Sequence, residues 1–260
     1  SCTSSTSTAV RRDRQNAAWT RRARRSELMQ DDYGEFVDAV MAVVTADGGS
    51  RARSDVATYF DPDTPFTGSR FEALADCHRA DEIAASDIVA VSMLGVNIPA
   101  EVAVWLLSDE GRLVVSTHLV DVPANVDLWE RPELIDREGE LWRLWYVLGE
   151  ACWPAPDRAN GMGTTKISKL LAAKRPRLVP VFDSVVRDVL PRVGSHWAAF
   201  SAVVSDPTRH QTILDATSSA PPHVSLLRRP DVALWMAHRR GRDPVWHWRS
   251  NGAASRFSRR

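Results

Sequence analysis

The stretch from Asn160 to Arg192 contains the residues whose types and spacing could carry chemistry (NGMGTTKISKLLAAKRPRLVPVFDSVVRDVLPR). It opens with Gly161-Met162-Gly163, a glycine–apolar–glycine turn directly before a predicted helix. Such a turn can present consecutive backbone N–H groups at a helix N-terminus, where they bind phosphate. A plain helix–helix turn follows the same pattern, so the glycines alone leave both interpretations open.

All lysines of the chain fall in the helix after this turn and at its end. Residues 158–192 carry five arginines and three lysines against two aspartates, whereas residues 29–157 carry eight arginines against twenty-five acids. A basic segment within an acidic body is typical of a polyanion-binding face. The candidate phosphate contacts are Lys166, Lys169, Lys174, Arg175 and Arg177. The alternative is a solvated helix face, on which Lys166 and Lys169 are i,i+3 neighbours.

Asp183 follows an apolar run, 178–182, and precedes another predicted helix. Aspartate is a preferred N-cap, worth about 1 kcal/mol to a helix start, so a structural role explains it. Alternatively, a carboxylate in a partly desolvated cleft could stabilise an oxocarbenium-like sugar and orient a water during N-glycosidic cleavage. The two roles are compatible, but only the second requires an open cleft.

The spacing of these residues resembles the helix-hairpin-helix DNA glycosylase superfamily, in which a proline and then a catalytic aspartate follow the second glycine at fixed distances. Pro180 and Asp183 stand at the matching positions, as do Val186, Leu190 and Arg192. The resemblance implies base excision repair on a flipped base, with Asp183 catalytic. It places duplex DNA against Gly161, Met162, Gly163, Thr164, Thr165, Lys166 and Lys169.

The sequence departs from the superfamily pattern at three places. Ala159-Asn160 replaces the usual Leu-Pro before the turn, and Asp188 replaces an arginine that is common five residues after the aspartate. Thr165 stands where the strand-cleaving members have their lysine. The resemblance therefore implies a monofunctional enzyme that forms no Schiff base.

A wider resemblance covers most of the chain. The segments YFDPDTPFTGSRFE, SDIVAVSMLGVNIP, KISKLLAAKRPRLVPVFDSVV and LLRRPDVALWM are similar to an actinobacterial family of unknown function. This resemblance implies common ancestry and an actinobacterial source, but it supplies no activity.

The composition limits the possible classes of protein. The 260 residues are 44% hydrophobic and 25% charged, which excludes a disordered chain, a fibrous repeat and a small disulfide scaffold. No apolar run is long enough for a membrane helix. Three distant cysteines form no C-x-x-C pair, and the histidines show no paired ligand spacing. We therefore expect a cytoplasmic protein with no metal, no cofactor and no membrane partner.

Apolar residues recur at helical spacing along most of the chain, which predicts an all-α fold. By resemblance, one lobe spans about 85–178 with a hairpin at 158–173, and the other combines about 29–84 with 179–245. Residues 1–28 are rich in Ser, Thr and Arg and are interpreted as a disordered basic tail or as sequence upstream of a natural start near Met29. A mitochondrial-type presequence is a further alternative. Residues 246–260 are interpreted as a basic C-terminal tail. The stretch 113–120 is ambiguous between a strand and a buried helix. Ser86-Asp87 is the predicted N-terminal cap of an apolar helix that runs through Met93 and Leu94.

Other polar and aromatic residues have plain structural explanations. Asp61 and Asp63 flank Pro62 in a predicted turn, although a phosphate or metal role is possible. The histidines are interpreted as surface or hydrogen-bonded core groups. The tryptophans could line a base-stacking pocket, and Trp153, just before the hairpin loop, is the best candidate for a role other than core packing. Helical spacing with aliphatic residues predicts core packing for Trp105, Trp142, Trp145, Trp197 and Trp235.

Two function hypotheses follow. The first is a monofunctional DNA N-glycosylase or a close relative that acts on a flipped base through Asp183. The second is a catalytically inert helical protein that binds DNA or another partner through the hairpin.

Overall fold

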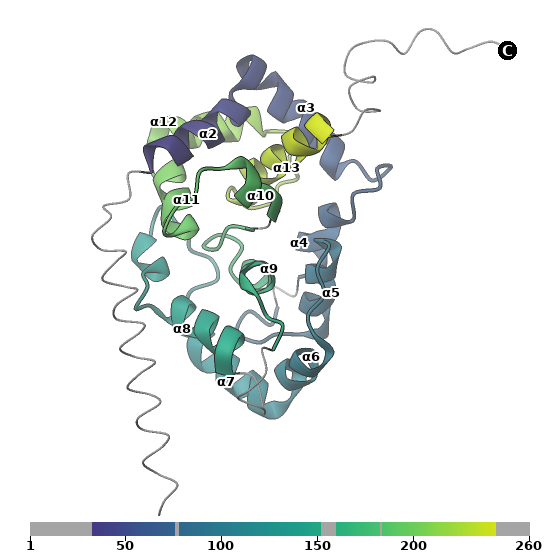
Figure 1. Cartoon of the computed structure of the whole chain (residues 1–260), viewed down its shortest axis with the longest axis vertical. Coiled ribbons are helices and arrows are strands. Elements are labelled where there is room, and N and C mark those ends of the chain that lie inside the picture. Colours follow the sequence, from purple (N-terminus) through teal and green to yellow (C-terminus); the bar gives the residue numbers. More distant parts are fainter. Residues whose placement is uncertain (1–32, 76–77, 152–159, 183, 243–260) are drawn as a thin grey trace, which may run out of the picture.

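The computed structural model describes residues 33–75, 78–151, 160–182 and 184–242. Every regular element in these ranges is a helix, which confirms the all-α prediction (Figure 1). None of these helices combines the length and the apolar character that crossing a bilayer requires. The two predicted tails, Trp153 and Asp183 lie outside the described residues.

One group of helices surrounds α13, which contacts α2, α3 and α10, while α11 and α12 lie against α2. The four-residue spacing of Phe36, Val40 and Val44 places them on one face of α2, and all three are buried. The bounds of these helices are α2 Gly34–Val44, α3 Ser50–Phe60, α10 Ser184–Val189, α11 His196–Val204, α12 Pro207–Ala216 and α13 Arg228–Arg242.

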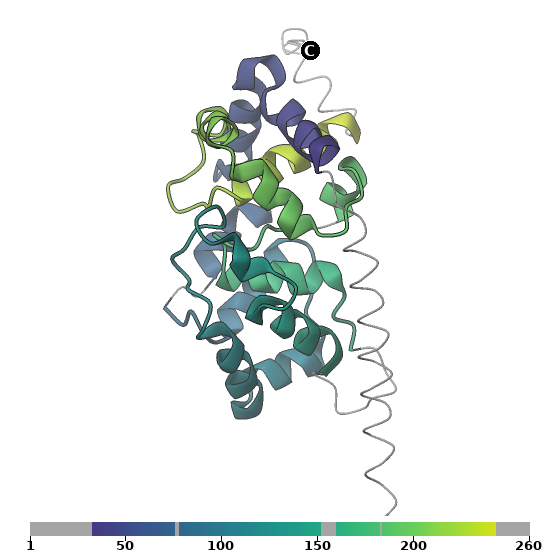
Figure 2. The ribbon, with the colours of Figure 1, turned by 90° about the vertical axis from the view of Figure 1, so that its left-hand side faces the viewer.

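The second group contains the chain's middle helices and α9, and the two groups are stacked along the long axis of the molecule (Figure 2). Its members are α5 Ala85–Met93, α6 Ala100–Leu107, α7 Asp109–Leu119, α8 Glu140–Tyr146, the π-turn η4 Val147–Ala151 and α9 Thr164–Lys174. The short helices η2 Thr67–Arg70 and α4 Phe71–Leu74 lie against α5. Two further 3₁₀ turns are η1 Ala46–Gly49 and η3 Pro132–Ile135. The division into lobes at residues 84 and 178 stays a prediction.

Helix α9 is viewed almost end-on near the middle of Figure 1. It is buried over most of its length. Every residue from Ile167 to Lys174 is buried. A charged group in such a place must be paired or hydrogen-bonded, because burying it alone costs several kcal/mol. The lysines of α9 are therefore held inside the protein.

The structure corrects one local expectation from the sequence and decides one alternative that the sequence left open. Helix α5 begins at Ala85, and Asp87 caps it from the third helical position, since its Oδ2 accepts the Ala84 N–H at 2.8 Å. The ambiguous stretch 113–120 belongs mostly to the helix α7. Val115 and Leu119 form its buried face, whereas Leu113 points outward with 69% exposure.

Candidate functional site

The hairpin turn is fixed by the residue that stands where the resemblance expects a proline. Asn160 is buried, and its Oδ1 accepts the Met162 N–H at 2.9 Å while its Nδ2 donates to Leu148 O at 2.9 Å. Gly161 has a φ of 72°, in the left-handed region that favours glycine. Met162 is buried in the core. Asn160 thus anchors the turn by hydrogen bonds.

The N-terminus of α9 is open. Its N-cap is Gly163, so no side chain bonds the first N–H groups, and the first turn contains no acidic residue. A Cβ built on Gly163 would meet nothing within 4 Å. Gly163 and Thr164 are exposed, and Thr165 and Lys166 are half-buried. This arrangement gives an anion access to the positive end of the helix.

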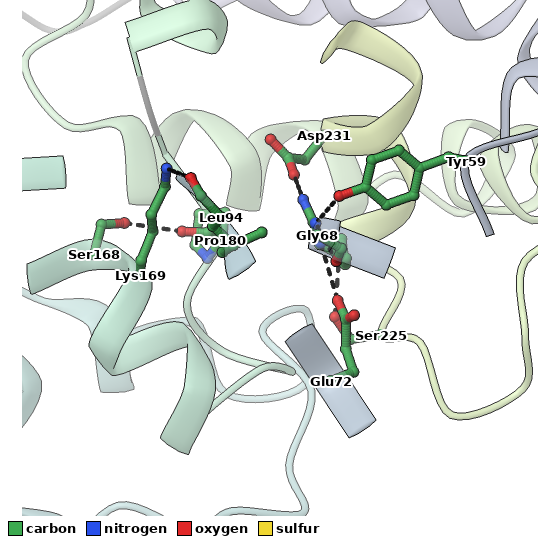
Figure 3. A network of polar contacts seen from close by, with 10 residues as sticks. Tyr59, Gly68, Glu72, Leu94, Ser168, Lys169, Pro180, Ser225 and Asp231 are labelled. Atoms are coloured by element: carbon green, nitrogen blue, oxygen red, sulfur yellow. Dashed lines mark hydrogen bonds and ion pairs between the residues drawn. The ribbon is translucent and has the colours of Figure 1, made fainter. Parts of the chain in front are cut away.

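The predicted phosphate cluster does not form as one surface patch. Lys169 is only 2% exposed, and its Nζ donates to Leu94 O at 2.9 Å, as Figure 3 shows. Lys174 pairs with Asp87 at 2.9 Å, and both side chains are fully buried. Burying these ammonium groups removes them from the reach of a nucleic acid backbone.

The two arginines of the same cluster differ in their exposure to solvent. Arg175 is buried, and its guanidinium donates to the carbonyl oxygens of Val122 and Leu119 at 2.7 Å each. Burial lowers the pKa of Arg175, although Asp81 opposes the shift. Arg177 is 43% exposed but forms an ion pair with Asp127. Of the predicted cluster, Lys166 and Arg177 have accessible side chains.

The segment after α9 runs between two cavities. The hydroxyl of Ser168 donates to Pro180 O at 3.1 Å and ties this segment to the helix. Val181 lines one cavity, and Phe182 lines the other. Asp183, which lies outside the described residues, follows directly in the chain.

The first cavity has a volume of about 270 Å³ and lies between the two groups of helices. Three aromatic rings form part of its wall: Tyr59 stacks on Phe66 at 5.6 Å, and Trp235 meets both edge-on. The guanidinium of Arg239 lies over Phe66 and Trp235. The cavity residues are Tyr59, Pro65, Phe66, Thr67, Gly68, Met93, Leu94, Gly95, Val181, Arg228, Asp231, Trp235 and Arg239.

Buried Arg228 organises the polar side of this cavity. Figure 3 shows Tyr59, Glu72 and Asp231 directed toward a common centre. Its Nη1 bonds Asp231, its Nη2 donates to Tyr59 Oη at 2.7 Å, and its Nε donates to Glu72 Oε1 at 2.9 Å. Burial alone would lower the pKa of Arg228, but Tyr59, Asp231 and Glu72 together raise it above its ordinary value. Burial also raises the pKa of Tyr59. Arg228 is thus a fixed cation that holds a carboxylate against the cavity.

No motif in the sequence predicts this network. The only signal was the i,i+3 spacing of Arg228 and Asp231 in LLRRPDVALWM, which resembles an ordinary surface pair on a helix. Tyr59 and Glu72 are distant in sequence, so no local pattern connects them to α13. In the ranges that the structure describes, no three His, Cys, Asp or Glu side chains gather as a metal site would require.

The second cavity is a groove of about 540 Å³ beside α10. The imidazole of His196 stacks on the ring of Phe182 with 4.1 Å between centroids and 17° between planes. His196 Nε2 is buried and has no hydrogen-bond partner among the residues that the structure describes, so within these residues the expectation of a hydrogen-bonded core histidine is not met. Burial lowers the pKa of His196 to about 3 and keeps the ring neutral. The groove is lined by Phe36, Phe182, Arg187, Asp188, Leu190, Pro191, Arg192, Val193 and His196.

The remaining predictions for individual residues have clear outcomes. The turn at Asp61 is confirmed, because its carboxylate accepts the Asp63 N–H at 2.9 Å. Core packing is confirmed for the five tryptophans that were assigned to it: Trp197 is fully buried, and the others pack against the core. Trp235 in addition lines the first cavity.

The fold and the cavities define an all-helical protein with a polar, aromatic-walled pocket between two groups of helices. Residues 52–238 match the model of the Family of unknown function (DUF6308), and the chain belongs to that family. The matched region includes the hairpin, α9 and the cavity residues from Tyr59 to Trp235. Neither a curated protein nor a solved structure matches the chain.

Proposed function

We propose that this chain binds DNA through its hairpin and acts as a monofunctional DNA N-glycosylase of the helix-hairpin-helix type. The open N-terminus of α9, directly after a left-handed glycine turn, is the observation that carries the proposal. The same residues, 160–192, carry the sequence resemblance to that superfamily.

Backbone chemistry supports DNA contact at the hairpin. The first turn of α9 offers N–H groups and the positive end of the helix dipole, and Lys166 adds one charge on the same turn. Contacts of this kind position a duplex without reading its sequence. Because Lys169 and Lys174 are buried, the phosphate contacts are few and the binding is weak.

The first cavity supports a role in base excision. A nucleobase has apolar faces and polar edges, which suit a wall of Tyr59, Phe66 and Trp235 next to a carboxylate held by Arg228. The volume of about 270 Å³ suits a ligand smaller than a drug molecule. In this proposal Asp183 supplies the charge that stabilises the developing sugar cation. Asp183 comes two residues after Val181, which lines the cavity.

A charge placed at Gly163 tests the DNA contact. A side chain fits there because the space is open and φ is −79°, and aspartate is a good N-cap. Gly163→Asp should therefore leave the fold as stable or more stable, yet it should abolish duplex binding measured by fluorescence anisotropy. Gly163→Asn caps the helix without the charge and is the matched control, so its affinity should stay within about threefold of wild type, about 0.7 kcal/mol. Equal binding by both variants would remove the hairpin from the proposal.

A second variant at the hairpin tests the electrostatic contribution. Lys166→Gln should lower the slope of log affinity against log salt by about one unit, the value of one phosphate contact. Arg51→Gln removes one positive charge from α3, which is distant in sequence from Lys166. This variant should leave the slope unchanged. A slope that responds to Arg51 rather than Lys166 would place the binding face elsewhere.

Base release from alkylated, deaminated or oxidised duplexes tests the catalytic part. Asp183→Asn should abolish release while duplex affinity is kept, because the carboxylate acts on charge that develops only in the transition state. The product should contain intact abasic sites that break only after alkali. Direct strand cleavage would contradict the monofunctional assignment. DNA binding without base release from any of these duplexes would leave a catalytically inert binding protein.

A further inference from the structure

The groove beside α10 combines two features that the proposed reaction does not use. One is the stacked pair of Phe182 and His196, which forms part of its wall. The other is the pair of arginines Arg187 and Arg192, which line it together with Asp188, the one carboxylate among the described residues of its wall. Aromatic faces next to a net positive charge are the combination with which proteins hold unpaired nucleotides.

The stacked pair is suited to a base rather than to an ion. His196 is neutral, because burial lowers the pKa of its ring to about 3, and so the pair presents aromatic surface without charge. Phe182 and His196 are both partly exposed, and both line the groove. Leu190 and Phe36 are buried and add apolar surface to the wall of the groove.

The arginines are available to an anionic ligand. Arg187 Nε lies 3.8 Å from Asp188 Oδ1, beyond hydrogen-bond distance, and both side chains are more than half exposed. Exposed pairs of this kind are weak, so a phosphate can replace the carboxylate at little cost. Arg192 is also exposed. The groove volume of about 540 Å³ is within the range of sites for nucleotide-sized ligands.

We propose that this groove binds an unpaired nucleotide, with the base against Phe182 and His196 and the strand's phosphates at Arg187 and Arg192. The proposal rests on the proposed function for its ligand, DNA, and adds the form of DNA that is preferred. A duplex with one unpaired nucleotide should bind more tightly than a fully paired duplex, because the unpaired base can stack without first breaking a pair.

Fluorescence anisotropy with the full chain tests this preference. The probes are a paired duplex, the same duplex with a single bulged nucleotide, and the bulged strand alone. Arg187→Gln/Arg192→Gln should weaken binding of the single strand about tenfold and lower its salt slope by about 1.4, from two contacts of about 0.7 each. Phe182→Leu keeps the apolar contact but removes the stacking face, and it should weaken the bulged duplex at least fivefold.

Matched controls separate this proposal from the proposed function. Arg51→Gln removes an arginine whose ion pair with Asp47 is exposed to a similar degree, so it should bind every probe as wild type does. If Gly163→Asp abolishes duplex binding while Arg187→Gln/Arg192→Gln changes nothing, the groove proposal fails and the hairpin function stands. If the protein binds none of the three probes, both the groove proposal and the proposed function are overturned. Binding of poly-glutamate but of no oligonucleotide, lost in the double arginine variant, would identify the groove as a site for acidic peptides.

Discussion

Lys174→Met is the perturbation whose effect follows most directly from the structure. The ammonium of Lys174 lies 2.9 Å from Asp87 Oδ2, and both side chains are fully buried. Methionine fills nearly the same volume as the lysine stem, so the substitution removes a charge without creating a large cavity. Asp87 keeps its hydrogen bond from the Ala84 N–H but loses its counter-ion in the protein interior.

Removing one partner of a buried ion pair costs about 3–5 kcal/mol. Lys174→Met should therefore lower the free energy of unfolding by about that amount, measured by urea denaturation at neutral pH. Lys166→Met changes the same residue type in the half-buried first turn of α9 and should cost less than about 0.5 kcal/mol. A change below about 1 kcal/mol for Lys174→Met would refute the buried pair and return Lys174 to the surface patch.

Adding Asp87→Asn to Lys174→Met tests the physical cause. Asparagine is neutral and can still accept the Ala84 N–H, so the double variant should recover part of the loss. Its free energy of unfolding should exceed that of Lys174→Met alone. If the two substitutions instead add, the loss comes from local packing rather than from an uncompensated charge.

Two further predictions concern pH and the N-terminal tail. An unfolded imidazole binds a proton below about pH 6.5, whereas folded His196 binds one only near its pKa of about 3. The free energy of unfolding should therefore decrease as the pH is lowered from about 6.5 toward about 3, by at most about 1.4 kcal/mol per pH unit. His196→Phe keeps the stacking and should show a shallower decrease between pH 7 and pH 5; identical pH profiles would contradict the buried neutral ring. A chain that begins at Met29 should melt within about 2 °C of the full chain, because residues 1–28 lack apolar periodicity. A much lower melting temperature would mean that the Arg-rich segment packs onto the acidic body.

The secondary structure could be predicted because helical periodicity is a local property. The apolar spacing of Phe36, Val40 and Val44 can be read directly from the sequence, and each of these side chains is buried. The turn before α9 could be predicted for the same reason, since a left-handed conformation at Gly161 requires glycine almost regardless of its surroundings. The start of a helix is not fixed by periodicity alone: Asp87 caps α5 from inside the helix rather than before it.

The environment of the charged residues was decided only by the tertiary structure. Lys166 and Lys169 are one helical turn apart, yet the first is half-buried and the second is in the interior, because α9 runs into the centre of the protein. Which end of α9 is covered depends on how α5 and its neighbours pack against it. The sequence of α9 alone does not determine that packing. The same reason hid the cavity network, in which Arg228 meets Tyr59 and Glu72 across more than 150 positions of chain. Local sequence thus determined the helices and the turn, while long-range packing determined which polar groups are structural and which are accessible to a ligand.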